Sequence, residues 1–198
     1  MKAYTGRGDR GNTKLYSGEQ VAKSHPRVEA CGDVDELNSL LGALISFLPK
    51  DGGDQRARIK HIQSLLVVAG TWLATTPESR EFGTVDSIQS SEIKMLELAM
   101  DFMDRDLPNI KELLLPGGHI SASFAHIART VCRRVERHVV RLAAESSERE
   151  AHRELMALLT FLNRLSAYLF VLARYLNFQH GVSEVPWKNH ISDPLLPE

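Results

Sequence analysis

Nine residues near the start of the chain, Thr5 to Thr13, combine the residue types that bind phosphate. They read Thr-Gly-Arg-Gly-Asp-Arg-Gly-Asn-Thr. Three glycines within six positions allow positive φ angles, which turn backbone N–H groups inward into an anion-binding concavity. Arg7 and Arg10 add positive charge, and Thr13 adds a hydroxyl group. The loop therefore predicts binding of an anionic ligand, most simply a phosphate.

Two known phosphate motifs nearly match this loop, and we reject both. Gly6, Gly8 and Gly11 spell G-x-G-x-x-G, but only five residues precede Gly6, too few for the strand of a dinucleotide-binding fold. Gly6 to Thr13 also approaches a Walker loop, yet Asn12 occupies the position of the phosphate-binding lysine. The alternative interpretation is a Gly-rich terminus without a ligand, because chain termini are commonly poorly ordered.

A row of arginines offers a second place for phosphate oxygens. The row recurs every fourth residue and consists of Arg129, Arg133, Arg137 and Arg141. Residues four apart share a helix face, and guanidinium groups can clamp phosphate with planar, bidentate donors. The alternative is a solvated surface with Glu136 as the internal salt-bridge partner, and composition alone favours that alternative.

Other polar residues in the predicted helices have two interpretations each. Asp33, Asp35 and Glu36 are either surface charge or partners for an arginine across an interface. Asn163 lies beside an apolar seam, where it either sets the helix register or contacts a ligand. No Glu is followed three residues later by His, so the Glu-x-x-His motif of helical di-iron sites is absent. We assign no role to His126.

The composition limits the classes of function. A net charge of −1 disfavours a nucleic-acid partner, although the first 27 residues carry six basic and two acidic residues, hence a local charge of +4. We find no signal peptide and no apolar run near ~18 residues, so we expect neither export nor membrane insertion. Cys31 and Cys132 match no zinc or C-x-x-C spacing and predict reduced thiols in a cytoplasmic protein.

Hydrophobic spacing predicts the helices that position these residues. Apolar residues recur at intervals of three and four over 28–48, 59–73, 90–103, 120–142 and 155–176. Ser90 or Ser91 is the expected cap of the third helix, and the expected buried stripe of the fourth includes Ile120, Ile127 and His138. The seven leucines of the fifth helix follow a strict 3.5-residue repeat, which predicts left-handed packing against its neighbours.

The predicted fold class is therefore all-α, a bundle of about five helices. We expect one domain over residues 1–198, with a ligand loop in 1–26, a helical bundle in 27–180 and an irregular tail in 181–198.

Several motifs taken together resemble the PduO-type ATP:cob(I)alamin adenosyltransferases (corrinoid adenosyltransferases). The resemblance covers nearly the whole chain in the right order, and it outweighs the surface interpretation of the arginine row. Its motifs are Thr5-x-x-Gly8-Asp9-x-Gly11-x-Thr13, then Gly18, Val21 and Lys23, Arg27 to Ser39, Leu115-Pro-Gly-Gly118, Ala128 to Arg137, and Leu162-Asn-Arg-Leu-Ser166-x-Tyr168-Leu-Phe170.

The resemblance implies transfer of the 5′-deoxyadenosyl group of ATP to the cobalt of cob(I)alamin, which forms adenosylcobalamin and releases triphosphate. It also implies a homotrimer with active sites between subunits. Arg133 is the implied catalytic residue, Asp35 and Arg129 are the implied intersubunit pair, and Leu113 and Phe170 are implied to line the corrinoid pocket. The implied ATP site comprises Thr5, Gly6, Arg7, Gly8, Asp9, Arg10, Gly11, Asn12, Thr13, Lys14, Lys23, Arg133, Arg134, Glu136, Arg137 and Asn163.

The same resemblance sets expectations for cofactors and partners. Mg²⁺ is expected on the phosphates, held mostly by ATP oxygens and water, with no dedicated protein metal site. A flavoprotein reductant and an adenosylcobalamin-dependent enzyme are possible partners. Leu113 stands where the family commonly has an aromatic residue that keeps the lower axial ligand off cobalt. This departure, together with Gly6-Arg7 where the family commonly has Lys or Arg and then Thr, motivates the alternative function. It is a corrinoid-binding or delivery protein of the same fold with reduced or no transferase activity.

Overall fold

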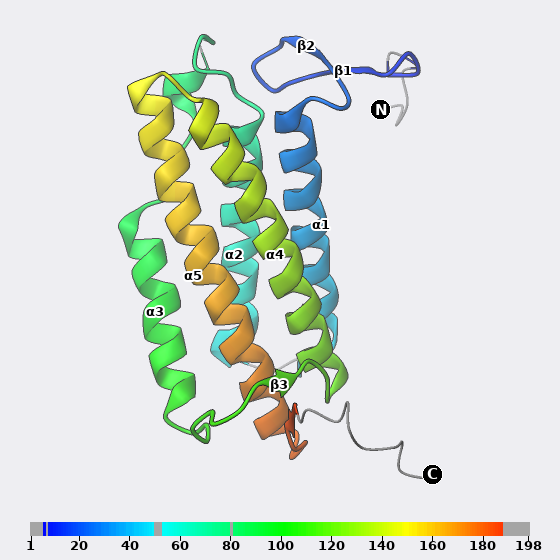
Figure 1. The fold of residues 1–198 in the computed structure, drawn as a ribbon, viewed down its shortest axis with the longest axis vertical. Coiled ribbons are helices and arrows are strands. Elements are labelled where there is room, and N and C mark those ends of the chain that lie inside the picture. The colour runs from blue at the N-terminus through cyan, green and yellow to red at the C-terminus, as the bar shows by residue number, and fades with distance from the viewer. Residues whose placement is uncertain (1–5, 7, 50–52, 80, 188–198) are drawn as a thin grey trace.

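The computed structural model describes residues 6, 8–49, 53–79 and 81–187, so Thr5 and Arg7 of the predicted loop lie outside the described residues. Five long helices run side by side along the long axis of the molecule (Figure 1). They are α1 Pro26–Ser46, α2 Gly53–Leu73, α3 Ser90–Asp104, α4 Ile120–Glu145 and α5 Arg149–Gln179, with a short 3₁₀ helix at Phe82–Thr84.

The core of the bundle lies around α5, which packs against α3 and α4, while α1 packs against α2 and α4. The leucine seam of α5 explains this central place. All seven of its members are buried, namely Leu155, Leu158, Leu162, Leu165, Leu169, Leu172 and Leu176. Full burial of one such side chain contributes about 1.5–3 kcal/mol, so the seam is a principal source of stability. The prediction of a bundle of five helices is confirmed, and the left-handed packing stays a prediction.

By length and composition alone, α5 could also cross a membrane. Its most apolar 18-residue window has a mean hydropathy of 1.7, and half of that window is buried inside the bundle. The central helix of a bundle passes the same test, which makes this weak evidence for a membrane span.

Two small antiparallel sheets accompany the helices and were not predicted. Strand β1 (Asn12–Lys14) pairs with β2 (Gln20–Ala22), and β3 (Leu114–Leu115) pairs with β4 (Val185–Pro186). These strands are two or three residues long and show no alternating pattern, so the sequence carried no strand signal. Within the predicted irregular tail, residues 185–186 form the short strand β4, whose partner β3 lies far earlier in the chain.

Some details of the predicted helices are also wrong. The residue before α3 is Gln89, which makes no side-chain capping bond, so neither Ser90 nor Ser91 is the cap. Ile120 and Ile127 of α4 are exposed, at 47% and 48%, although we predicted them in the buried stripe. The buried face of α4 instead carries several alanines, whose small side chains allow close packing on α1 and α5.

The two cysteines are free thiols, as predicted. Burial raises the pKa of Cys31 to about 11 and raises the pKa of Cys132 still further. Both Sγ atoms lie within hydrogen-bonding distance of backbone carbonyl oxygens, Cys31 at 3.5 Å from that of Gly70 and Cys132 at 3.3 Å from that of Leu162. Thiols with raised pKa values are poor nucleophiles, so neither cysteine is a candidate nucleophile.

Candidate functional site

The predicted phosphate loop leads into the β1–β2 hairpin, which lies beyond the start of α1 at one end of the bundle (Figure 1). Gly6 and Gly11 have φ angles of +68° and +80°, the left-handed conformation that the glycine spacing allowed. Gly8 serves a different purpose, because a Cβ there would lie 3.3 Å from the Nζ atom of Lys23. The hairpin therefore brings Lys23 onto the loop, as the site prediction requires.

A concave space of about 810 Å³ adjoins this loop. The side chains of Arg10, Lys14 and Lys23 are exposed near it and give it a positive potential. Such a space, with free cations and backbone N–H groups, is suited to a polyanion. It is lined by Gly6, Gly8, Arg10, Asn12, Thr13, Lys14 and Gln20.

The hairpin is tied to the C-terminal end of α2 through one carboxylate. Glu19 accepts hydrogen bonds from the hydroxyl groups of Ser17 and Thr76, the second at 2.5 Å. These bonds, with that of Ser17 first, lower the pKa of Glu19 below its ordinary value. The backbone N–H of Thr76 also donates to the Ser17 hydroxyl at 3.2 Å. The turn of the hairpin is therefore fixed to the chain that follows α2.

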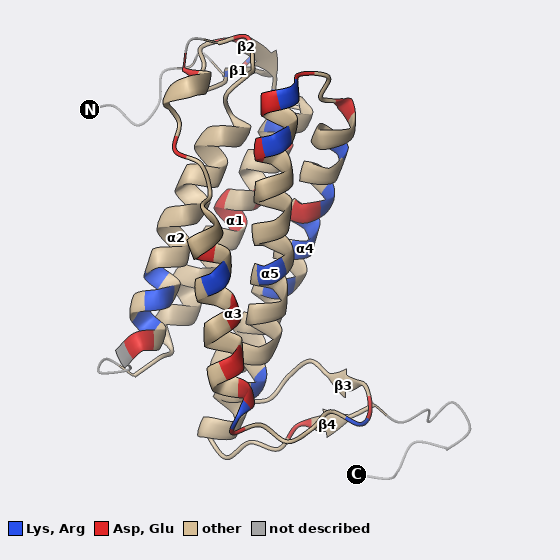
Figure 2. Ribbon diagram, turned by 90° about the vertical axis from the view of Figure 1, so that its left-hand side faces the viewer, with Lys and Arg blue, Asp and Glu red and all other residues tan. Residues whose placement is uncertain are grey.

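Three members of the arginine row, Arg133, Arg137 and Arg141, are exposed on α4, along which Figure 2 shows basic residues repeated. Arg133 and Arg137 are exposed, and neither forms an ion pair with any other residue that the structure describes. Glu136, the proposed internal partner of a surface row, instead accepts a hydrogen bond of 3.2 Å from the Nδ2 of Asn163. Arg133 and Arg137 are thus without ion-pair partners among the described residues. They lie beside the hydrogen bond that joins Glu136 of α4 to Asn163 of α5.

Arg134, also on α4, points toward α1. Its Nε lies 3.0 Å from the Oδ2 of Asp33 on α1, and a second ion pair joins it to Glu36. His138 Nε2 lies 3.2 Å from the same Asp33 oxygen, and the side chain of this histidine of the predicted buried stripe is 15% exposed. The hydrogen bond to Asp33 raises the pKa of Arg134. This predicted ATP residue is therefore engaged in joining α1 to α4.

Arg129 and Phe170 lie together on the adjoining faces of α4 and α5. The guanidinium carbon of Arg129 lies 6.0 Å from the centroid of the Phe170 ring, within cation–π range. The Nε atom of Arg129 is buried and has no hydrogen-bond partner among the described residues. Asp35, its predicted partner, is exposed on α1 and is not paired with it within the chain. The single chain does not bring this predicted pair together.

His126 lies beside the same pair and was missed by the sequence analysis. Its ring centroid is 6.2 Å from that of Phe170, and it lines a cavity of about 120 Å³ under the β3 segment, together with Leu115 and Asn177. Burial, followed by the charge of Arg129, lowers the pKa of His126, so the imidazole is neutral at neutral pH. Leu113, next to β3, is 73% exposed and free to meet a ligand.

Two buried polar residues of α5, Arg174 and Asn177, were also missed. They are 5% and 3% exposed and hold the segments around β3 and β4. A charged residue and an amide within an apolar helix were the available signal in the sequence.

Comparison with known proteins identifies the family of the chain. The sequence profile of the family described as cobalamin adenosyltransferase matches residues 3–176. A cobalamin adenosyltransferase of Cupriavidus metallidurans is 40% identical over 187 residues, which are 94% of each chain. A corrinoid adenosyltransferase of Bacillus subtilis is 36% identical over 95% of this chain and 93% of its own. The chain belongs to the cobalamin adenosyltransferase family.

Solved structures give the same result for the fold. A variant of the PduO-type ATP:corrinoid adenosyltransferase from Lactobacillus reuteri, complexed with cobalamin and ATP, superimposes with a TM-score of 0.85 at 35% identity. The match covers 95% of this chain and all of that one. A second variant of that enzyme, complexed with ATP, has a TM-score of 0.82 at 34% identity over 93% of this chain and 99% of its own.

Proposed function

We propose that this chain transfers the 5′-deoxyadenosyl group of ATP to the cobalt of cob(I)alamin, forming adenosylcobalamin and releasing triphosphate. The observation that carries the proposal is the pair of free arginines, Arg133 and Arg137, beside the Asn163–Glu136 hydrogen bond. Family membership supports it, because relatives with this fold are corrinoid adenosyltransferases.

The chemistry needs no general base from the protein. The reduced cobalt is the nucleophile, a Co–C bond forms at the 5′ carbon, and the C5′–O bond breaks toward triphosphate. The protein must orient two substrates and stabilise the charge that develops on the leaving group. Arg133 is the proposed catalytic residue for this task, since its side chain is exposed and has no ion-pair partner among the described residues. Loss of one such donor typically costs about 3 kcal/mol of transition-state stabilisation.

The order of residues along α4 suits the two substrates. His126 and Arg129 lie near the β3 segment with the proposed corrinoid residues Leu113 and Phe170. Arg137 follows His126 by eleven residues, which on a helix is roughly 16 Å. A track of that length accommodates a nucleoside triphosphate whose ribose meets cobalt at one end and whose phosphates meet arginines at the other.

A homotrimer completes this site in our proposal. The loop and Lys23 lie at the end of the bundle, whereas Arg133 is near the middle of α4, roughly 18 Å from the end of that helix. A loop from a neighbouring copy, rather than the chain's own, would cover the arginines. Asp35 of one copy would then meet Arg129 of the next, which supplies the partner that the buried Nε of Arg129 lacks among the described residues.

We further propose that Mg²⁺ enters with ATP, held mostly by phosphate oxygens and water. Within the described ranges, no group of three or more His, Cys, Asp or Glu side chains is placed to hold a metal ion. Arg10, Lys14 and Lys23 would surround the phosphates with positive charge and would not ligate the ion. The expected setting is cytoplasmic, where a flavoprotein could supply the reduced corrinoid and an adenosylcobalamin-dependent enzyme could receive the product.

The test is direct. The protein is mixed with ATP, Mg²⁺ and chemically reduced cob(I)alamin, and the absorbance change of Co–C bond formation is followed. Product formation well above the enzyme-free control is expected. No excess over that control, combined with tight corrinoid binding, would instead favour a corrinoid-delivery protein of the same fold.

A further inference from the structure

We infer that Arg174, Glu184 and Asn177 are positioning residues that hold Leu113 in place to receive the corrinoid. The inference rests on the proposed function, because it takes Leu113 as part of the corrinoid pocket. None of the three residues needs to touch either substrate. They act through the β3 and β4 segments, and their loss is expected to affect corrinoid use far more than ATP use.

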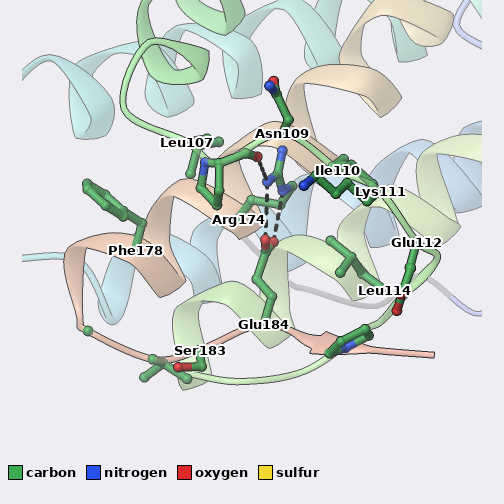
Figure 3. Close-up of a pocket in the computed structure, with 14 residues that line it drawn as sticks. Leu107, Asn109, Ile110, Lys111, Glu112, Leu114, Arg174, Phe178, Ser183 and Glu184 are labelled. Atoms are coloured by element: carbon green, nitrogen blue, oxygen red, sulfur yellow. Dashed lines mark hydrogen bonds and ion pairs between the residues drawn. The ribbon is translucent and has the colours of Figure 1, made fainter. Parts of the chain in front are cut away.

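The first contact is a buried ion pair at the centre of Figure 3. The Nε and Nη2 atoms of Arg174 donate to the two carboxylate oxygens of Glu184 at 2.8 and 3.1 Å. Nη2 also donates to the backbone carbonyl of Pro108 at 2.7 Å. Arg174 is 5% exposed, so this planar, bidentate pair is largely shielded from solvent. One side chain of α5 thereby fastens both the connection after α3 and the segment before β4.

The second contact lies one turn further along α5. Asn177 donates from Nδ2 to the carbonyl of Gly117 at 3.0 Å and accepts at Oδ1 from the N–H of His119 at 2.8 Å. Gly118 lies between them with a φ angle of +103°, and a Cβ there would be 2.2 Å from the Asn177 oxygen. The backbone thus approaches the amide so closely that only glycine fits.

The two contacts bracket the segment that carries Leu113. Pro108 precedes it and Gly117 follows it, and both are fixed to α5 at positions three residues apart. Glu184 directly precedes β4, which pairs with β3. The N–H of Trp187 donates to the carbonyl of Leu113 at 2.6 Å. The backbone of Leu113 is therefore held from both sides while its side chain stays 73% exposed.

The effect of the Arg174–Glu184 pair on the position of Leu113 can be separated from its effect on the stability of the fold by replacing both residues together. Removal of one partner of a buried pair leaves an uncompensated charge, which destabilises the whole fold. Replacement of both partners by apolar residues of similar volume is often neutral for stability. A double Arg174→Met/Glu184→Met variant should thus fold well but lose the directional link from α5 to β4.

The experiment compares this double variant with wild type and with Arg153→Met, a control on the same helix whose side chain is 72% exposed. We expect the KM for cob(I)alamin to rise at least fivefold, with the KM for ATP within twofold of wild type. Hydrogen exchange at the Trp187 amide should accelerate at least tenfold, while exchange in α1 and α2 stays unchanged. Arg174→Lys, which keeps the charge without the planar fork, should give an intermediate KM.

Three results would overturn the inference. These are an unchanged KM for cob(I)alamin, an equal rise in both KM values, or faster Trp187 exchange without any effect on corrinoid use. Should wild type make no Co–C product, the proposed function fails, and the inference is then judged by cob(II)alamin binding. In that case, wild-type affinity in the double variant would contradict it, and at least fivefold weaker binding would support it.

Discussion

The two proposed halves of the site are built in opposite ways. On the nucleotide side, the cations Arg133, Arg137 and Lys23 are exposed and make few contacts within the chain. On the corrinoid side, buried Arg174 and Asn177 form three hydrogen bonds to the backbone on either side of Leu113 and two to the carboxylate of Glu184. The cations of the first half have no anionic partner within the part of the chain that the structure describes, whereas the polar groups of the second half are already paired.

This difference has a physical reason. A triphosphate carries a large negative charge and can itself pair with the cations of the site. Internal anionic partners of those cations would have to be displaced first, at a cost in binding free energy. An apolar face of a corrinoid offers no such charge, so a pocket for it depends on shape fixed beforehand. We therefore expect substitutions on the nucleotide side to lower the rate of turnover, and substitutions on the corrinoid side to change the binding of the corrinoid.

The largest effect is expected at the arginine row. Arg133→Ala should lower kcat by a factor of about 10² to 10³, because it removes a donor aimed at the leaving triphosphate. The measurement is turnover with saturating ATP and cob(I)alamin, alongside circular dichroism to verify helix content. Arg141→Ala, one turn beyond Arg137 on the same helix, is the matched control and should retain activity. Equal activity of Arg133→Ala and wild type would place the phosphate clamp elsewhere.

The second prediction concerns the proposed intersubunit pair. Asp35→Arg and Arg129→Asp should each weaken ATP binding at least tenfold and reduce the molar mass seen by light scattering, since a truncated interface pair typically costs about 2–5 kcal/mol. The double charge swap should recover most of both properties. A double variant no better than the worse single variant would show that the two side chains do not meet.

A smaller effect is expected at Leu113. An aromatic ring in its place should add about 0.5–1 kcal/mol of contact to the corrinoid face, a factor of roughly two to five. Leu113→Phe should therefore increase the four-coordinate Co(II) signal in the electronic spectrum of bound cob(II)alamin. The exposed Leu98 of α3 provides a control, because Leu98→Phe makes the same substitution outside the bracketed segment. An unchanged spectrum in Leu113→Phe would contradict the role of this position.

The smallest effect is a pH dependence of the hairpin. The folded pKa of Glu19 is lowered, first by Ser17 and then by Thr76, so its contribution is complete above the ordinary value of 4.5. That contribution is lost as the pH falls through the lowered folded pKa, because the protonated carboxyl group no longer accepts both bonds. Hydrogen exchange at Leu15, whose N–H donates to the carbonyl of Glu19 at 3.0 Å, should thus accelerate in acid. In Glu19→Gln this acceleration should disappear, and its persistence would point to another titrating group.

The helices were predictable because their signals are local. The leucine repeat of α5 lies within one segment, and each of its members is buried as expected. The glycine spacing of the loop also indicated positive φ angles correctly for Gly6 and Gly11. The sequence predicted the type of these elements without any knowledge of their neighbours.

The missed features all depend on contacts between distant segments. The β3–β4 pairing joins residues near 115 and 185, and no local pattern of two residues predicts it. The exposure of Ile127 depends on which face of α4 meets α5, which small alanines decide. Arg174 finds its carboxylate ten residues away and its carbonyl acceptor in another connection. Such residues were recognisable only as polar exceptions within an apolar helix.

The hydrogen bond from Trp187 to Leu113 also gives the molecule an optical reporter. The sequence holds two tryptophans, and they lie in contrasting environments. Trp72 is 6% exposed and packs edge-on against Phe82 at 5.0 Å, whereas Trp187 is 47% exposed. Trp72 should emit fluorescence at a shorter wavelength than Trp187. A corrin bound near Trp187 would absorb the emission of Trp187. Quenching of Trp187 emission would therefore report a corrinoid bound at the proposed site beside Leu113, in the unlabelled protein.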